Sequence, residues 1–350
     1  MNRFSFLTQA TDRSRLPVAL LSGFLGSGKT TLINALLRDP RMAGTAVAVN
    51  EFGDIPLDRD LIDHGADKTV VLANGCLCCN LAGDMEDAVM RLFSRREGGE
   101  VPRFQRLLIE PSGLADPAPI AQAILRNPVM SRAMRLEAIV TTVDALFGES
   151  QLARHPETRK QVALADRLVL TKTDLVTTAS LERLQLELRN QNPAAPIFKA
   201  PHGVVDATLL FPPSFFDLAV STQAPNRSGL FADSVDPDHR GRHAVVSLFA
   251  DRPLIWRAFD NWLRRIRIEH GEHLLRVKGM LEIESVDGPV VVQGIHHVLN
   301  APVELDAWPD GERRSRLVLI ADRATIDTVR ESWATGLPGM IRSIGTPTAY

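Results

Sequence analysis

Several features that define other protein classes are absent from this 350-residue chain. No window approaches eighteen consecutive apolar residues, so the sequence predicts no membrane span. The first residues are polar and include Asp12, Arg13 and Arg15, so they lack the apolar stretch of a signal peptide. The net charge of -2 gives no electrostatic reason to expect binding to nucleic acid or an anionic membrane. We therefore expect a cytoplasmic protein.

Cysteine is scarce, but its three occurrences, Cys76, Cys78 and Cys79, lie within four residues. An odd number this closely spaced is a poor disulfide framework and, in a reducing cytosol, favours a metal or redox site. Three thiolates select Zn²⁺, Cu⁺ or Co²⁺ over Mg²⁺ and leave one tetrahedral position open. Glu51, a histidine or a ligand from a partner can fill that position. Buried inert thiols and a vicinal redox disulfide are the alternatives.

The length of the chain exceeds what one compact core usually covers, so we expect two domains. Strand-like runs alternate with helical patterns in the first part, which predicts an α/β domain with a mostly parallel sheet covered by helices. A stretch rich in Pro, Gly, Ser, Asp and Arg then predicts a linker before a small C-terminal α+β domain. The expected division is an N-terminal extension at 1–16, the α/β domain at 17–220, the linker at 221–243, the α+β domain at 244–335 and a tail at 336–350.

Hydrophobic periodicity predicts the individual elements of both domains. In the first domain we expect strands at 17–21, 45–50, 69–72, 106–109, 136–143 and 167–170, and helices at 29–38, 84–96 and 155–165. In the second we expect strands at 244–250, 274–283, 290–299 and 316–320, and helices at 254–270 and 325–334. The pair His296 and His297 would then lie on a strand with side chains on opposite faces, which disfavours a shared metal.

Residues 23–30, GFLGSGKT, fit the phosphate-binding pattern G-x-x-x-x-G-K-[ST] at every fixed position. An apolar strand is expected before them and a helix after them. The glycines let successive backbone N–H groups curl around phosphate oxygens, and the helix N-terminus adds its positive dipole end. Lys29 should reach the β- and γ-phosphates, and the Thr30 hydroxyl should ligate Mg²⁺. A chance glycine-rich turn is the alternative.

Two further segments follow in the order expected of a GTPase. Residues 171–174, TKTD, resemble the N/T-K-x-D motif, in which Asp174 accepts hydrogen bonds from guanine N1–H and N2–H₂ and the stem of Lys172 lies across the base. The first position is Thr instead of the usual Asn, which removes a polar contact. Residues 107–113, LLIEPSG, end a strand where Glu110 can hold Mg²⁺ through water and the Gly113 N–H can sense the γ-phosphate. Plain loops after strands are the alternative for both segments.

Five segments in this order resemble the CobW-type P-loop GTPases, a metallochaperone family: GFLGSGKTT (23–31), VNEFGD (49–54), NGCLCC (74–79), IEPSGLADP (109–117) and TKTD (171–174). The segments KGML (278–281) and QGIHHV (293–298) resemble the CobW C-terminal domain. The resemblance covers roughly residues 17–335. The linker offers only His239 and His243, so storage of metal in a histidine-rich tract, as in many members, is not expected.

The resemblance implies slow GTP hydrolysis with Mg²⁺ and binding of zinc, or alternatively cobalt, for delivery to client metalloproteins. It assigns phosphate and Mg²⁺ to Gly23, Gly26, Ser27, Gly28, Lys29, Thr30 and Thr31, the guanine to Lys172 and Asp174, and metal to Cys76, Cys78, Cys79 and Glu51. Lys29, Thr30 and Glu110 are the expected catalytic residues. The group that orients the attacking water is not assigned: Asp54, Glu51, Glu110 and a partner's residue are all candidates.

Two functions from other classes remain open on the sequence. A non-catalytic module could use nucleotide and metal only to fix its shape, although Lys29 and Thr30 favour real phosphate chemistry. The second alternative function is a P-loop kinase that acts on a small acceptor. Asp174 disfavours it, because this residue lies in a guanine-type base motif. The C-terminal domain is expected to recognise clients or to mediate self-association. The aromatics among residues 256–267 are expected to pack in the core, with the arginines solvated.

Overall fold

The computed structural model describes residues 8–9, 15–49, 71–73, 83–211, 243–308 and 311–340. The chain divides into two compact units. The first is Arg13–Leu218, and the second combines Met1–Asp12 with Ala219–Tyr350. The second unit includes a strand that precedes the first unit in sequence, because β1 (Thr8–Gln9) pairs in parallel with β13 (Val303–Glu304). The expected N-terminal extension therefore contains an edge strand.

The first unit is built on a seven-stranded sheet in the order β4-β3-β5-β2-β6-β7-β8, and every neighbouring pair runs parallel. In chain order, the strands are β2 (Leu16–Gly23), β3 (Thr45–Val49), β4 (Val71–Ala73), β5 (Arg106–Glu110), β6 (Met134–Asp144), β7 (Arg167–Thr171) and β8 (Ile197–Ala200). The strand β2 lies in the middle, between β5 and β6. The loop that follows it therefore leaves the centre of the sheet's carboxyl edge.

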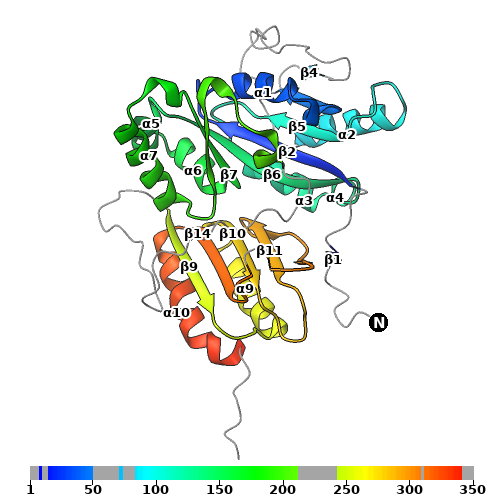
Figure 1. The fold of residues 1–350 in the computed structure, drawn as a ribbon. Coiled ribbons are helices and arrows are strands. Elements are labelled where there is room, and N and C mark those ends of the chain that lie inside the picture. The colour runs from blue at the N-terminus through cyan, green and yellow to red at the C-terminus, as the bar shows by residue number, and fades with distance from the viewer. Residues whose placement is uncertain are drawn as a thin grey trace, which may run out of the picture. The chain divides into compact units, whose positions relative to one another are not determined.

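Helices cover both faces of this sheet (Figure 1). Those described are α1 (Lys29–Leu37), α2 (Gly83–Glu97), α3 (Ala118–Arg126), α4 (Met130–Ala133), α5 (Gly148–Arg154), α6 (Pro156–Leu164), α7 (Thr178–Gln191) and α8 (Ala207–Leu210). On β7, Val169 packs into a buried cluster with α1, whereas Leu168 and Leu170 pack with α6 and α7. Successive strand side chains point to opposite faces, so α1 and the α6–α7 pair lie on opposite sides. The expected α/β fold is confirmed.

The second unit is a mainly antiparallel sheet in the order β1-β13-β11-β10-β14-β9, with β12 paired to β11. Its remaining strands are β9 (Ala244–Ala250), β10 (Leu274–Leu281), β11 (Val290–Ile295), β12 (Val298–Leu299) and β14 (Ser315–Ala321). Two helices belong to it, α9 (Trp256–His270) and α10 (Arg323–Met340). The expected small α+β domain is therefore present.

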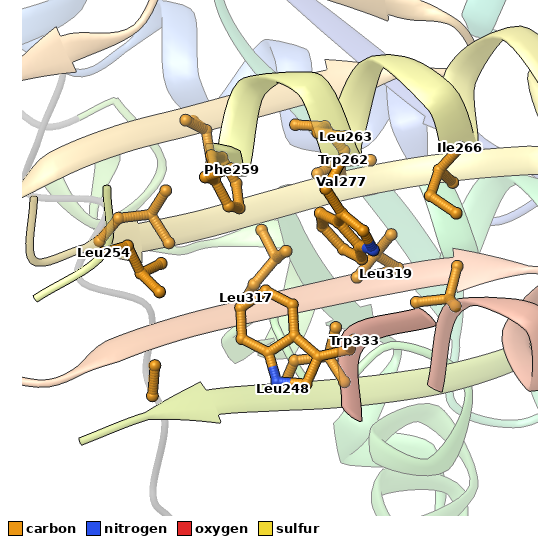
Figure 2. Close-up of a cluster of buried hydrophobic side chains, with 14 of the residues drawn as sticks. Leu248, Leu254, Phe259, Trp262, Leu263, Ile266, Val277, Leu317, Leu319 and Trp333 are labelled. Atoms are coloured by element: carbon orange, nitrogen blue, oxygen red, sulfur yellow. The ribbon is translucent and has the colours of Figure 1, made fainter. Parts of the chain in front are cut away.

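A single apolar cluster joins both helices to one face of the second sheet (Figure 2). From α9 it takes Phe259, Trp262 and Leu263, and the Trp262 ring meets that of Trp333 on α10 edge-on, with centroids 5.1 Å apart. The Trp262 indole N–H donates to the Ser332 hydroxyl at 3.0 Å, so its polar atom is satisfied. The expectation that the α9 aromatics form core is confirmed.

The expected strand over residues 290–299 is interrupted. His296 and His297 form a turn between β11 and β12, and the flanking residues Ile295 and Val298 are paired. His296 has a φ of 52°, which is the left-handed backbone of a two-residue hairpin turn. The prediction that these histidines lie on a strand was wrong, and so was the argument from opposite faces.

In the described part of the chain, no helix combines the length and the apolar character needed to cross a membrane.

Candidate functional site

The expected nucleotide-binding residues follow neighbouring strands at one edge of the first unit's sheet. Register places Gly23, at the end of β2, beside Thr142 on β6, and Asp144 at the end of β6 beside Thr171 at the end of β7. The carboxyl ends of parallel strands are the usual place for ligands in open α/β sheets. The topology therefore gathers the P-loop, Glu110 and the TKTD segment on one edge.

The P-loop itself has the backbone shape that its glycines allow. Gly23 has a φ of 142°, and a Cβ there would lie 2.1 Å from the Thr142 Oγ1 and 2.6 Å from the Thr142 carbonyl oxygen. Gly28 has a φ of 86° and caps the N-terminus of α1. The Lys29 ammonium lies within the loop, because its Nζ donates to the carbonyls of Gly23 at 3.0 Å and Phe24 at 3.2 Å. Only glycine fits at Gly23 without displacing backbone.

Hydroxyl groups from two neighbouring strands hold the middle of the loop. The Ser27 Oγ and the Thr142 Oγ1 are 2.7 Å apart and share a hydrogen bond in a buried position. The Thr171 Oγ1 donates to the Ser27 carbonyl at 2.8 Å. Thr171 is the residue that replaces the usual Asn of the base motif, and its hydroxyl makes a polar contact with the phosphate loop. Thr at this position was expected to lack one polar contact of the usual Asn, but its hydroxyl makes a different one.

Lys172 joins the base motif to the phosphate loop a second time. Its Nζ donates to the Gly26 carbonyl at 2.9 Å and pairs with the Asp144 Oδ2 at 2.6 Å. Asp144 is almost fully buried, and its other oxygen accepts from the backbone N–H groups of Leu146 and Phe147. A buried carboxylate held by three donors fixes the position of the lysine. Asp144 was not predicted, although an acid directly after an apolar strand is a readable signal.

Asp174 lies in the short turn η3 (Thr173–Leu175) and faces the turn η4 (Pro201–Gly203) after β8. Its Oδ1 accepts from the His202 N–H at 3.3 Å, and its Oδ2 lies 3.5 Å from the His202 Nδ1. A hydrogen bond from its own backbone N–H lowers the pKa of Asp174, and the His202 N–H and ring lower it further. The lowered pKa keeps the Asp174 carboxylate ionised, so it can act only as a hydrogen-bond acceptor.

The segment after β5 packs directly against the phosphate loop. A Cβ on Gly113 would lie 2.7 Å from the Leu25 backbone N, so the two backbones are in close contact. Gln161 on α6 is buried, and its Nε2 donates to the carbonyls of Gly113 and Ala115, both at 3.0 Å. Glu110, also buried, ends β5 on the same edge. The role of Gln161 was not predicted, because it arises from contacts far apart in sequence.

The expected metal ligands Glu51, Cys76, Cys78 and Cys79, and also Asp54, lie outside the described residues. Within the described ranges, no group of three or more His, Cys, Asp or Glu side chains could hold a metal ion. The strands that lead to the two ligand segments are described, and they are neighbours. Val49 at the end of β3 is paired in parallel with Ala73 at the end of β4.

Comparisons with known proteins match most of the chain to a single family. The CobW/HypB/UreG nucleotide-binding domain matches residues 17–199, and the cobalamin synthesis protein CobW C-terminal domain matches residues 244–337. The zinc chaperone YjiA of Escherichia coli is 33% identical over 322 residues, which cover 91% of this chain and 98% of YjiA. The zinc chaperone CobW of Pseudomonas aeruginosa is 28% identical, covering 89% of this chain and 90% of that protein.

Among solved structures, the Zn(II)-bound YjiA GTPase from E. coli superposes with a TM-score of 0.69 at 26% identity, covering 92% of this chain and 98% of that one. The two matched domains correspond to the parallel-sheet unit and the antiparallel-sheet unit described above. The chain therefore belongs to the CobW/HypB/UreG family and carries the CobW C-terminal domain.

Proposed function

We propose that this chain is a GTP-hydrolysing zinc chaperone that binds Zn²⁺ through Cys76, Cys78 and Cys79 and passes it to client metalloproteins. YjiA and the Pseudomonas CobW are named zinc chaperones, and the YjiA structure is that of a Zn(II)-bound GTPase. One structural observation carries the proposal: Val49 and Ala73 end paired strands at the same sheet edge as the P-loop. The strands that lead into the segments with Glu51 and the cysteines therefore end side by side, at the edge that carries the P-loop.

The phosphates of GTP are bound by the loop around Lys29. Its backbone N–H groups and the N-terminus of α1 attract negative charge, and the Lys29 ammonium transfers from loop carbonyls to phosphate oxygens. The Thr30 hydroxyl and the Glu110 carboxylate are the oxygen donors that Mg²⁺ prefers, so the residues present fit the ion. When bound, Mg²⁺ neutralises charge that develops on the β- and γ-phosphate oxygens.

Guanine is selected by Asp174, whose ionised carboxylate accepts from both N1–H and N2–H₂. Adenine lacks this pair of donors and would leave the carboxylate partly unpaired, so ATP binds more weakly. Lys172 is held against Gly26 and Asp144 at the rim of the phosphate loop, where its stem can cover the base. The base motif and the phosphate loop therefore respond together to the nucleotide.

Nucleotide state then alters metal affinity, because the Glu51 segment follows β3, which is paired with β5, and the cysteine segment follows β4, which is paired with β3. Glu110 pairs with Val49 in register, so a change at the γ-phosphate is transmitted through β5 to the start of the Glu51 segment. Glu51 or a client's residue completes the tetrahedral zinc site, and cobalt is the alternative cargo. A reducing cytoplasm keeps the three thiols available for metal.

The test is a zinc titration of the wild-type chain and the Cys76→Ala/Cys78→Ala/Cys79→Ala variant, each with GDP and with a non-hydrolysable GTP analogue. We expect tight zinc binding by the wild type, at least a tenfold difference in zinc affinity between nucleotide states, and loss of that site in the variant. GTP turnover is measured in parallel, with and without Zn²⁺ or Co²⁺.

Lys29→Ala is the matched control, because it removes phosphate chemistry and leaves all three thiols in place. It should retain zinc binding while losing GTP turnover and the dependence on nucleotide. Zinc affinity equal in both nucleotide states, or unchanged in the triple cysteine variant, would overturn the proposal. Turnover of ATP in preference to GTP would instead favour a kinase-like function.

A further inference from the structure

The second unit contains an open groove at the C-terminal end of α9. Its volume is about 580 Å³, and it is lined by Arg264, Arg267, Ile268 and His297. The first three come from consecutive turns of α9, and His297 comes from the turn between β11 and β12. Gly271 allows the two elements to meet, because a Cβ there would lie 2.8 Å from the His297 Cβ. All of these residues lie outside the nucleotide site.

The groove lies on the face of α9 that does not pack into the core. Phe259, Trp262, Leu263 and Ile266 point into the apolar cluster (Figure 2), whereas Arg264 and Ile268 lie on the other side of the helix. Ile268 is 77% exposed and is the most exposed of the large apolar residues in the described part of the chain. Contact with another apolar group would remove this exposed aliphatic surface from water, which is favourable in free energy.

The two arginines make this groove cationic and partly preorganised. The Arg264 Nη2 pairs with Asp260 at 3.1 Å, and the Arg267 Nε donates to the His297 carbonyl at 2.8 Å. Burial lowers the pKa of Arg267, with the charge of Asp260 opposing and that of Arg264 reinforcing the shift. The Arg267 guanidinium is partly desolvated, and one of its N–H groups is used in the bond to His297. Its other N–H groups can donate to a carboxylate, and such charge-assisted hydrogen bonds would stabilise a bound acidic group.

We propose that this groove docks an acidic segment of the client protein, with carboxylates on Arg264 and Arg267 and one apolar side chain on Ile268. The client is the occupant because delivery requires a surface that recognises it, so the identity of the partner rests on the proposed function. The charge is complementary to an acidic peptide in an otherwise slightly acidic chain. A short acidic segment fits better than nucleic acid, because the lining combines two arginines with one exposed aliphatic side chain instead of a long basic stripe.

The experiment measures binding of short fluorescein-labelled peptides to the full chain by fluorescence anisotropy. The probe is the acetylated peptide Glu-Asp-Leu-Glu-Asp, and its comparisons replace Leu by Ser or all four acids by Lys. We expect the Leu peptide to bind several-fold more tightly than the Ser peptide, and the Lys peptide not to bind. Charge reversal in Arg264→Glu/Arg267→Glu should weaken binding at least tenfold, and Ile268→Ser several-fold.

Arg257→Glu/Arg323→Glu is the matched control, because it changes net charge equally at exposed arginines away from the groove. It should bind the Leu peptide as the wild type does. Zinc affinity and GTP turnover of the groove variant should be unchanged, so loss of peptide binding is distinct from failure of the proposed function. Its unfolding temperature should fall slightly, because the variant loses the pair with Asp260 and the bond to the His297 carbonyl. Ile268→Ser removes neither contact, so its weaker peptide binding tests the groove independently of that change. Equal peptide binding by groove and control variants, no binding by the wild type, or tighter binding of a single-stranded DNA 20-mer would overturn the proposal.

Discussion

The Thr171 hydroxyl donates a hydrogen bond to the Ser27 carbonyl at 2.8 Å, across 144 residues of sequence. This bond fastens the start of the base motif to the middle of the phosphate loop. Both atoms are buried, so water cannot replace either partner. The residue at the first position of TKTD therefore supports the phosphate loop as well as belonging to the base motif.

Replacing Thr171 by Val keeps its shape and removes this donor. Leaving a buried carbonyl unsatisfied costs about 1–3 kcal/mol, and we expect roughly a tenfold loss of affinity for GDP. ADP affinity should fall by the same factor, because the substitution disturbs the phosphate loop and leaves the contacts to the base unchanged. Fluorescent-nucleotide titration measures both. Thr171→Ser retains the hydroxyl and should bind like the wild type; an equal loss in both variants would contradict this account.

Replacing Gly113 by Ala places a methyl group against the Leu25 backbone. The Cβ would lie 2.7 Å from the Leu25 N and 2.9 Å from its Cα, so one backbone must move. We expect lower nucleotide affinity and a loss of about 1–3 kcal/mol of unfolding free energy. Chemical denaturation with and without GDP measures both. Gly339→Ala, which meets no atom within 4 Å, is the control and should leave stability unchanged or slightly higher.

Asp174→Asn should shift base preference from GTP towards XTP. An amide presents one acceptor and one donor, which matches the carbonyl that xanthine carries in place of the guanine amino group. The pKa of Asp174 is lowered, first by its own backbone N–H. If the ionised form binds guanine as proposed, the ratio of wild-type GTP affinity to ATP affinity should be constant from pH 8 to 5 and fall only below the usual Asp pKa of 3.8; the ratio is used because the γ-phosphate of both nucleotides titrates within this range. Equal GTP and XTP affinities in the wild type and in Asp174→Asn would contradict this account.

Asp322→Ala should remove the cap of α10. The Asp322 Oδ1 accepts from the Thr325 N–H at 2.8 Å, and loss of such a cap costs about 1 kcal/mol. Burial opposes ionisation of Asp322, but hydrogen bonds from Thr325 and the charges of His273 and His270 outweigh it, so its pKa is lowered. The stabilisation is therefore complete above the unfolded pKa and disappears as pH falls through the lower folded pKa.

Thermal unfolding from pH 7 to pH 3 measures this effect, with Asp327→Ala, an exposed acid within α10, as the control. The difference between wild type and Asp322→Ala should persist to about pH 4 and shrink below it. A difference that does not change with pH would show that the Asp322 charge is not what stabilises the helix.

Hydrophobic periodicity and short motifs in the sequence predict many of the strands and helices. The strand that precedes the P-loop, the helix that begins at Lys29 and the strand Ala244–Ala250 were predicted nearly to the residue, because each has a clear period or a motif at its boundary. Helix α7 was not among the expected elements, although Leu181, Leu184 and Leu188 carry a helical spacing. The spacing of these leucines by itself indicates the helix.

Other features depend on contacts that no local pattern encodes. The hairpin turn at His296 and His297 contains no glycine or asparagine, so the residues that usually mark such a turn are missing. The bonds from Gln161 to Gly113 and from Lys172 to Asp144 join segments whose proximity arises only from the parallel sheet. The P-loop was predictable because a short motif determines its shape, whereas its supports come from β6, β7 and α6.

The pairing of β1 with β13 has a consequence for biosynthesis. Thr8 and Gln9 leave the ribosome before the entire nucleotide-binding unit. Their partners in the strand register, Val303 and Glu304, are made near the end of translation. The nascent nucleotide-binding unit can therefore fold first, whereas the second sheet cannot be completed until its C-terminal strands have been synthesised. Deletion of the leading residues should leave β13 with an open edge, a template for unwanted pairing between chains.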